Sequence, residues 1–163
     1  MRLVITDIKE LQSAQNTSQR VITDDGSIHN CIGCFGCWIK TPGQCVIKDG
    51  YENIGKLFSQ CDDLLIISKC FYGGFSPFVK NVLDRAISYI SPHFVIRSGE
   101  MHHKRRYVNV INMTVYFYGG NITEDEMKTA QSLVTANALN YDGRVNRVLF
   151  FNSADEAREA LPL

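Results

Sequence analysis

The sequence predicts a three-layer α/β domain built on a parallel sheet of about five strands. The first observation is an unbroken apolar run, Leu64 to Ile67, which is typical of a strand buried on both faces of a parallel sheet. The second is a helix signal that follows it, because Ser76 suits the N-cap and Pro77 the first helical position. The third is the recurrence of strand, loop and helix along 163 residues, a length that predicts a single domain over residues 1–163.

Charge and composition narrow the classes of function. Seventeen basic residues balance seventeen acidic ones, so no overall positive field attracts nucleic acid and we expect no nucleic-acid partner. No apolar segment approaches the roughly 20 residues that span a bilayer, and the N-terminus has no apolar region of the signal-peptide kind. We therefore expect no membrane partner and a cytoplasmic location. In that compartment, six cysteines indicate redox or metal chemistry, or burial, rather than disulfides.

The first two strands are expected at Arg2 to Thr6 and around Val21 to Thr23. A crossover between parallel strands takes a dozen or more residues with its helix. Residues 12–19, QSAQNTSQ, have almost no apolar side chains with which such a helix could dock. We therefore predict that the first helix is stunted.

The remaining elements continue the alternation and favour a flavodoxin-like three-layer sandwich. We expect a modest helix from Tyr51 to Ser59, a helix with apolar spacing from Pro77 to Ile90, an irregular segment over 91–106, a strand within 107–117, a helix with a capping box at Thr123 and Glu126, a last strand from Arg147 to Phe151, and a closing helix from Ala154 to Leu161.

The first candidate ligand site is the loop over residues 69–76. Ligands of open α/β sheets bind beyond the carboxyl ends of the strands, and this loop follows the central strand. It contains two adjacent glycines, three aromatic residues and a thiol, Cys70. Cys61, which precedes the central strand, is expected in the core.

Four cysteines form a compact motif. Cys31, Cys34, Cys37 and Cys45 follow C-x2-C-x2-C-x7-C spacing, with two glycines between the first three. The glycines allow the backbone to turn sharply, so we expect the four thiols to lie close together. Four thiolates suit a [4Fe–4S] cluster or a structural zinc ion. Burial as small apolar side chains, and a thiol or disulfide switch, are the alternatives.

The segment from Cys31 to Arg85 resembles a known family. The run CIGCFGCWIKTPGQCVIKD, the strand LLIIS, the loop KCFYGGFSP and the helix ending in Leu83-Asp84-Arg85 closely resemble the flavodoxin-like NAD(P)H-dependent FMN reductases, including the iron–sulfur flavoproteins. The resemblance implies an FMN-dependent NAD(P)H oxidoreductase or electron carrier, with NAD(P)H or a redox partner. It also implies that the four cysteines bind an iron–sulfur cluster.

The resemblance further implies where FMN would lie, across the loops that follow the third and fourth strands. The implied contacts are Cys70, Phe71, Tyr72, Gly73, Gly74, Phe75, Ser76, Tyr118, Gly119 and Gly120. In such a site the cofactor carries the redox chemistry, and the protein supplies stacking surface and hydrogen bonds. Backbone amides around Gly73, Gly74 and Gly119 are expected to supply those hydrogen bonds.

The phosphate-binding loop of the family is degenerate in this chain. The first strand runs into Asp7-Ile8-Lys9-Glu10, without a glycine. Asp7 and Glu10 would place negative charge beside a dianionic phosphate, which is unfavourable by about 1 kcal/mol or more. The alternative function is therefore a flavin-free relative that acts through its cysteine segment or binds a partner.

Two further expectations concern surfaces. Aromatic residues expected near one end of the sheet predict an apolar patch and hence a homodimer or larger assembly: Phe71, Tyr72, Phe75, Tyr89 and Phe94. The basic run from Met101 to Arg106 is either a solvated loop or a replacement for the phosphate loop. In the second case Arg105 and Arg106 reach the phosphate in a site on a neighbouring subunit, and His102 and His103 add donors.

Overall fold

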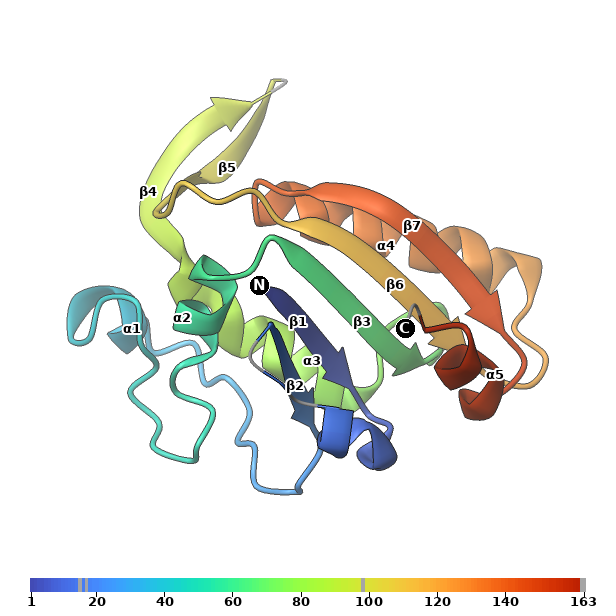
Figure 1. Cartoon of the computed structure of the whole chain (residues 1–163). Helices are drawn as coiled ribbons and strands as arrows, with labels where there is room; N and C mark the ends of the chain where they lie inside the picture. Colours follow the sequence, from blue (N-terminus) through green and yellow to red (C-terminus); the bar gives the residue numbers. More distant parts are fainter. Residues whose placement is uncertain (15, 17, 98, 162–163) are drawn as a thin grey trace.

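A computed structural model describes residues 1–14, 16, 18–97 and 99–161 (Figure 1). Its main sheet has five strands: β1 (Arg2–Thr6), β2 (Gln19–Thr23), β3 (Asp63–Lys69), β6 (Asn112–Tyr118) and β7 (Arg144–Phe151). The strands are all parallel and lie in the order β2-β1-β3-β6-β7. Numbered along the chain, this is the order 2-1-3-4-5 of one common doubly wound fold. The predicted parallel sheet is confirmed.

One face of the sheet packs against α2 (Ile54–Ser59), α3 (Pro77–Arg85) and α4 (Glu124–Asn140). Alternate residues of the strands point to this face, since side chains in a strand alternate between the two faces. Leu3, Ile5, Leu64, Ile66, Met113, Val115 and Phe117 are fully buried there. They form the larger of two apolar clusters in the core.

The opposite face carries a thinner layer, formed by η1 (Lys9–Ala14) and α5 (Ala154–Glu159). Figure 1 shows both short elements on the side of the sheet away from α3 and α4. The first helix is a 3-10 segment of six residues, so the prediction of a stunted first helix is confirmed. Because η1 and α5 are short, an open groove of about 480 Å³ remains along β3, β6 and β7.

Residues 91–106 do not form the irregular segment that we predicted. They lie almost entirely in an antiparallel hairpin of β4 (Ile90–Arg97) and β5 (Glu100–Arg105), which projects beyond the amino ends of the sheet strands (Figure 1). The hairpin is tied to the body of the protein by Asp142, whose carboxylate forms ion pairs with Arg97 at 2.9 Å and Arg105 at 2.7 Å. A distant carboxylate thus stabilises a hairpin that the local sequence did not indicate.

Several element boundaries also differ from the prediction. The strand expected from residue 107 begins at Asn112, because the Asn109 amide donates to the carbonyls of Phe58 and Cys61 and holds the preceding segment against α2. The helix expected from Tyr51 begins at Ile54. The helix expected to reach Ile90 ends at Arg85, where η2 (Ala86–Tyr89) follows.

The local capping signals are confirmed. The Ser76 hydroxyl accepts from the Val79 amide at the start of α3, and Thr123 and Glu126 form a complete capping box at the start of α4. In the described part of the chain, no helix combines the length and apolar character that crossing a lipid bilayer requires.

Candidate functional site

The carboxyl ends of β1, β3 and β6 meet at one carboxylate. Asp7, the residue after β1, accepts a hydrogen bond from the Lys69 amide through Oδ2 and one from the Tyr118 hydroxyl through Oδ1, each at 3.0 Å. The Cys70 amide donates to the Tyr118 carbonyl at 2.9 Å. Burial and the charge of Asp7 raise the pKa of Tyr118. The loops after these strands therefore form one continuous edge at the β1/β3 switch point, where ligands of this fold bind.

The loop after β3 is a tight turn. The amides and carbonyls of Phe71 and Gly74 exchange hydrogen bonds of 2.9 and 2.7 Å, and Tyr72 and Gly73 between them have φ of 49° and 76°. A Cβ at Gly73 would lie 2.7 Å from the Thr129 Cβ, so the turn can pack this closely on α4 only with glycine.

Two aromatic rings of this turn face solvent. Tyr72 is 91% exposed and Phe71 is 42% exposed, with the Lys69 Nζ 5.4 Å from the Phe71 ring centroid. Exposed rings at the carboxyl edge of a parallel sheet offer a stacking surface for a flat ligand.

The end of the loop is part of the core. Phe75 is buried and stacks on Phe117 with ring centroids 5.3 Å apart. The amide of Ser76 donates to the Ser68 hydroxyl at 2.8 Å. Phe75 and Ser76 thus fix the loop on the sheet. Cys70 is half-buried, and burial raises the pKa of its thiol.

Two of the three backbone amides expected to bind the ligand are engaged elsewhere. The Gly74 amide donates to the Phe71 carbonyl, and the Gly119 amide donates to the Phe151 carbonyl at 3.0 Å. That expectation is therefore wrong for Gly74 and Gly119. Gly120, the last residue predicted in this loop, is exposed beside Asn121, which has φ of 67°.

The basic run from Met101 to Arg106 lies at the other end of the sheet. It belongs largely to β5, near the amino ends of the strands (Figure 1), and Arg105 is paired with Asp142. Within one chain it does not reach the carboxyl edge, so the hypothesis that it replaces the phosphate loop requires a neighbouring subunit and stays a prediction. The predicted aromatic patch is also not contiguous. Phe75 and Tyr89 are buried, and Phe94 lies in β4 of the hairpin.

The four motif cysteines share one cavity. Cys31, Cys34, Cys37 and Cys45 line one mostly apolar cavity of about 40 Å³. Cys37 and Cys45 are buried, whereas Cys31 and Cys34 are exposed. Burial and the neighbouring Cys45 and Cys31 thiols raise the pKa of the Cys37 thiol. Cys61 is buried in the core as predicted, and burial raises its pKa to about 12.

The cysteine cavity has the donor set of a metal site without its final geometry. Four sulfurs around one cavity are the ligand number and type of a [4Fe–4S] cluster. In residues 1–14, 16, 18–97 and 99–161, no group of three or more Cys, His, Asp and Glu side chains is arranged to hold a metal ion. The residues fit in number and chemistry, and binding would require the thiols to draw closer.

A buried ion pair anchors the cysteine segment to α3. Arg85 forms a two-pronged contact with Asp49, at 2.7 and 2.9 Å, and the two side chains are 0% and 3% exposed. Arg85 also donates to the carbonyls of His29 and Ile47. No pattern in the sequence indicated this pair. In the sequence, Arg85 stands at a helix end and Asp49 before a glycine, and both are ordinary positions for surface residues.

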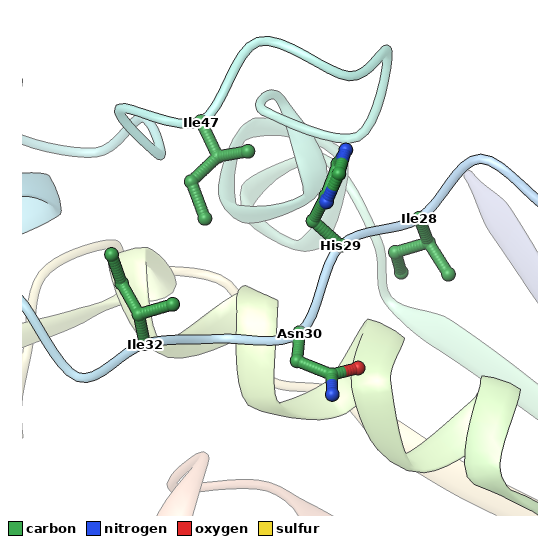
Figure 2. Close-up of a pocket in the computed structure, with 5 residues that line it drawn as sticks. All are labelled: Ile28, His29, Asn30, Ile32 and Ile47. Atoms are coloured by element: carbon green, nitrogen blue, oxygen red, sulfur yellow. The ribbon is translucent and has the colours of Figure 1, made fainter.

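A wider pocket adjoins the cysteine cavity. It has a volume of about 560 Å³ and is lined by Ile28, His29, Asn30, Ile32 and Ile47. Figure 2 shows Ile32 and Ile47 pointing toward each other from two facing segments. Both residues also line the cysteine cavity, so the two hollows are neighbours.

The strand order and the joined loops at the carboxyl edge define a flavodoxin-like α/β protein. Three solved structures share this fold over 97–98% of the chain: the Trp repressor binding protein of Bacillus subtilis (TM-score 0.58, 13% identity, 93% of that chain), an FMN-dependent NADH-azoreductase of Bacillus anthracis (0.56, 12%, 92%) and general stress protein 14 of Treponema denticola (0.53, 13%, 89%).

Two curated proteins are similar in sequence over part of the chain. An iron–sulfur flavoprotein of Archaeoglobus fulgidus is 27% identical over 82 residues, which are 50% of this chain and 36% of that protein. An iron–sulfur flavoprotein of Methanocaldococcus jannaschii is 34% identical over 62 residues, which are 38% of this chain and 31% of that protein. The matches thus span about a third of each relative's length. No family model matches the chain.

Proposed function

We propose that this chain is a flavoprotein that binds FMN at the carboxyl edge of its sheet and acts as an NAD(P)H-dependent oxidoreductase or electron carrier. The observation that carries the proposal is the joining of the loops after β1, β3 and β6 through Asp7 at the switch point of a flavodoxin-like sheet. Two of the structural neighbours are described as complexes with FMN, and two are named for NADH or NADPH.

The proposed ring site uses the exposed part of the two loops. Phe71 and Tyr72 supply stacking surface, and the thiol of Cys70 and the loop from Tyr118 to Gly120 lie beside them on the same edge. Phe75 and Ser76 fix the loop through their contacts with the sheet. FMN held there would supply hydride-transfer chemistry between NAD(P)H and an acceptor.

The protein suits the phosphate of FMN less well than it suits the flavin ring. Asp7 places a carboxylate at the end of β1, where phosphate-binding sheets of this class have a glycine-rich turn and a helix N-terminus. The ring loops therefore supply most of the proposed affinity.

The test is the absorption spectrum of the purified protein before and after incubation with FMN. The proposal expects the yellow absorption of flavin, a stoichiometry of one FMN per chain after gel filtration, and bleaching of that absorption when NADH or NADPH is added anaerobically. Protein that stays colourless after reconstitution and releases no flavin on acid denaturation would exclude it.

A second candidate function belongs to the cysteine cavity, because four thiols of the chain line one hollow. We propose that Cys31, Cys34, Cys37 and Cys45 bind an iron–sulfur cluster, which when bound exchanges single electrons. Both curated relatives are named iron–sulfur flavoproteins. Anaerobically reconstituted protein should be brown and contain about four iron atoms per chain, whereas the absence of both iron and zinc would remove this candidate.

For the assembly, we infer a homo-oligomer that forms through the β4–β5 hairpin. Phe94, Ile96 and Met101 are 62–66% exposed there. Among the described residues, β4 and β5 pair only with each other, so each leaves an edge open for a second copy. Light scattering at micromolar concentration should give at least a dimer mass, and Ile96→Ser with Phe94→Ser should give a monomer. A wild-type monomer would contradict the inference.

A further inference from the structure

The guanidinium of Arg85 has one donor left over. An arginine has five N–H donors. Four are engaged, because Nη1 donates to the His29 carbonyl at 2.8 Å and Asp49 Oδ2 at 2.7 Å, and Nη2 donates to the Ile47 carbonyl at 3.3 Å and Asp49 Oδ1 at 2.9 Å. The fifth donor, Nε, is buried and has no hydrogen-bond partner in the part of the chain that the structure describes.

The unpaired donor belongs to a side chain that forms part of the cysteine cavity. Arg85 lines this cavity together with the four motif cysteines, and it is fully buried. The Cys45 sulfur interacts with the guanidinium, yet without the geometry of a full hydrogen bond. A buried donor without a partner is unfavourable. The Nε atoms of Arg97 and Arg106 are also buried without a partner, but among the described residues only Arg85 of the three lines the cysteine cavity.

The chemistry of the acceptor supplies that explanation. A neutral thiol is a weak hydrogen-bond acceptor, whereas a metal-bound thiolate is charged and accepts a much stronger bond. Among the described residues that line the cavity, Arg85 is the charged one, and a site with four thiolates is anionic. The spare donor and the charge of Arg85 both match a metal-bound state of Cys45 better than its thiol state.

The engaged donors explain how the motif is held together. Cys31, Cys34 and Cys37 follow the His29 segment, whereas Cys45 belongs to the segment that contains Ile47 and Asp49. Arg85 bonds to both segments from the last residue of α3. Its guanidinium therefore sets how closely the first three cysteines approach the fourth.

We propose that Arg85 is the positioning residue of a metal site at the four-cysteine cavity, with its Nη donors joining the two cysteine segments and its Nε donating to the metal-bound sulfur of Cys45. The inference rests on the second candidate function above. Outer donors to metal ligands typically change metal affinity by 10–100-fold. We expect an effect of that size for Arg85.

The test uses Co²⁺ alone as the probe, added anaerobically to reduced full-length protein that has been freed of metal. Wild-type protein should bind Co²⁺ with the sulfur-to-cobalt charge-transfer absorption of thiolate ligands. Arg85→Lys keeps the positive charge beside Asp49 but lacks Nε and the planar fork, so it should bind Co²⁺ about 10–100-fold more weakly. Its charge-transfer bands should also shift, because Cys45 loses a donor.

Two control variants separate positioning from general stability. Lys80→Gln removes an exposed cation from the same helix, and Thr123→Ala removes the cap of α4, away from the cavity. Both should bind Co²⁺ as the wild type does. Arg85→Gln is a larger change, because it also removes the positive charge. Circular dichroism and a count of reactive thiols show whether each variant is folded.

The outcomes separate the two proposals. If folded Arg85→Lys binds Co²⁺ with wild-type affinity and an unchanged spectrum, the role of Arg85 is overturned while the metal site stands. If the wild-type protein shows no thiolate-to-cobalt absorption, the metal site itself is removed, and the inference about Arg85 falls with it. If Thr123→Ala loses affinity as much as Arg85→Lys, the effect is one of stability and the positioning role is overturned.

Discussion

The hydroxyl of Tyr118 donates a hydrogen bond of 3.0 Å to Asp7 Oδ1, across 111 residues of sequence. The other oxygen of the same carboxylate accepts from the Lys69 amide. Asp7 therefore does at the end of β1 what a ligand phosphate would do in a related fold: it accepts hydrogen bonds at the switch point. Asp7, whose charge made the phosphate loop look degenerate in sequence, joins the loops after β3 and β6.

Replacing Asp7 by Asn should favour a phosphate-bearing flavin. The change removes a negative charge that would lie near the phosphate, and about 1 kcal/mol of repulsion corresponds to roughly fivefold in affinity. Titration by flavin fluorescence should show tighter FMN binding by about that factor and unchanged binding of riboflavin, which has no phosphate. An equal change for both ligands would mean that Asp7 acts on loop geometry and not on the phosphate.

The turn after β3 should tolerate no side chain at Gly73. Gly73→Ala forces a Cβ into the left-handed region at φ of 76° and against Thr129 and Glu126, at 2.7 and 2.9 Å. We expect a loss of about 2 kcal/mol or more in the free energy of unfolding, measured with urea, and weaker flavin binding. Gly120→Ala is the matched control, because a Cβ at Gly120 meets nothing within 4 Å. Similar stabilities of the two variants would contradict the packing argument.

Breaking the buried ion pair should cost far more than breaking an exposed one. Asp49→Asn leaves the fully buried Arg85 without its counter-charge, which typically destabilises by about 3–5 kcal/mol. Lys80→Ala breaks the exposed pair with Asp84 on the surface of α3 and should cost about 1 kcal/mol or less. Urea unfolding at pH 7 compares the two variants, and equal losses would refute the assignment of the buried pair.

The contribution of the same pair to the free energy of unfolding should be lost in acid. Hydrogen bonds from Arg85, opposed in part by burial, hold the pKa of Asp49 well below its usual range. The unfolded chain therefore takes up the proton first. The contribution is fully present above the unfolded pKa of about 4 and is lost as pH falls below it toward the folded pKa. Wild-type protein should lose more stability than Asp49→Asn between pH 5 and pH 3, and parallel curves would contradict this.

The sequence predicted those parts of the fold that depend on neighbours along the chain. The apolar run in β3, the Ser76 and Thr123 caps and the polar composition that leaves η1 short are local signals, and each was read correctly. The spacing of the four cysteines and the two glycines between them are likewise local, and all four residues line one cavity. These features need no knowledge of the tertiary structure.

Features set by distant partners were missed or misjudged. The β4–β5 hairpin depends on Asp142, about 40 residues further on, and its polar sequence carries no strand periodicity of its own. The engagement of Gly74 and Gly119 depends on turn geometry and on β7. Arg85 and Asp49 are ordinary surface residues by type, and only the folded chain shows that they are buried together. Long-range polar pairing is what local patterns do not encode.

The dependence of the hairpin on Asp142 can be tested directly. Asp142 forms ion pairs with Arg97 and Arg105, one from each strand of the hairpin, and it has φ of 54°, which Asn tolerates well. Asp142→Asn should therefore keep the backbone while loosening the hairpin. Trypsin should then cleave the segment from Arg97 to Arg106 several times faster, because an opened strand fits the protease better than a paired one. Asp125→Asn breaks an exposed pair on α4 and serves as the control. If mass spectrometry finds equal cleavage of the hairpin in both variants, Asp142 does not hold it.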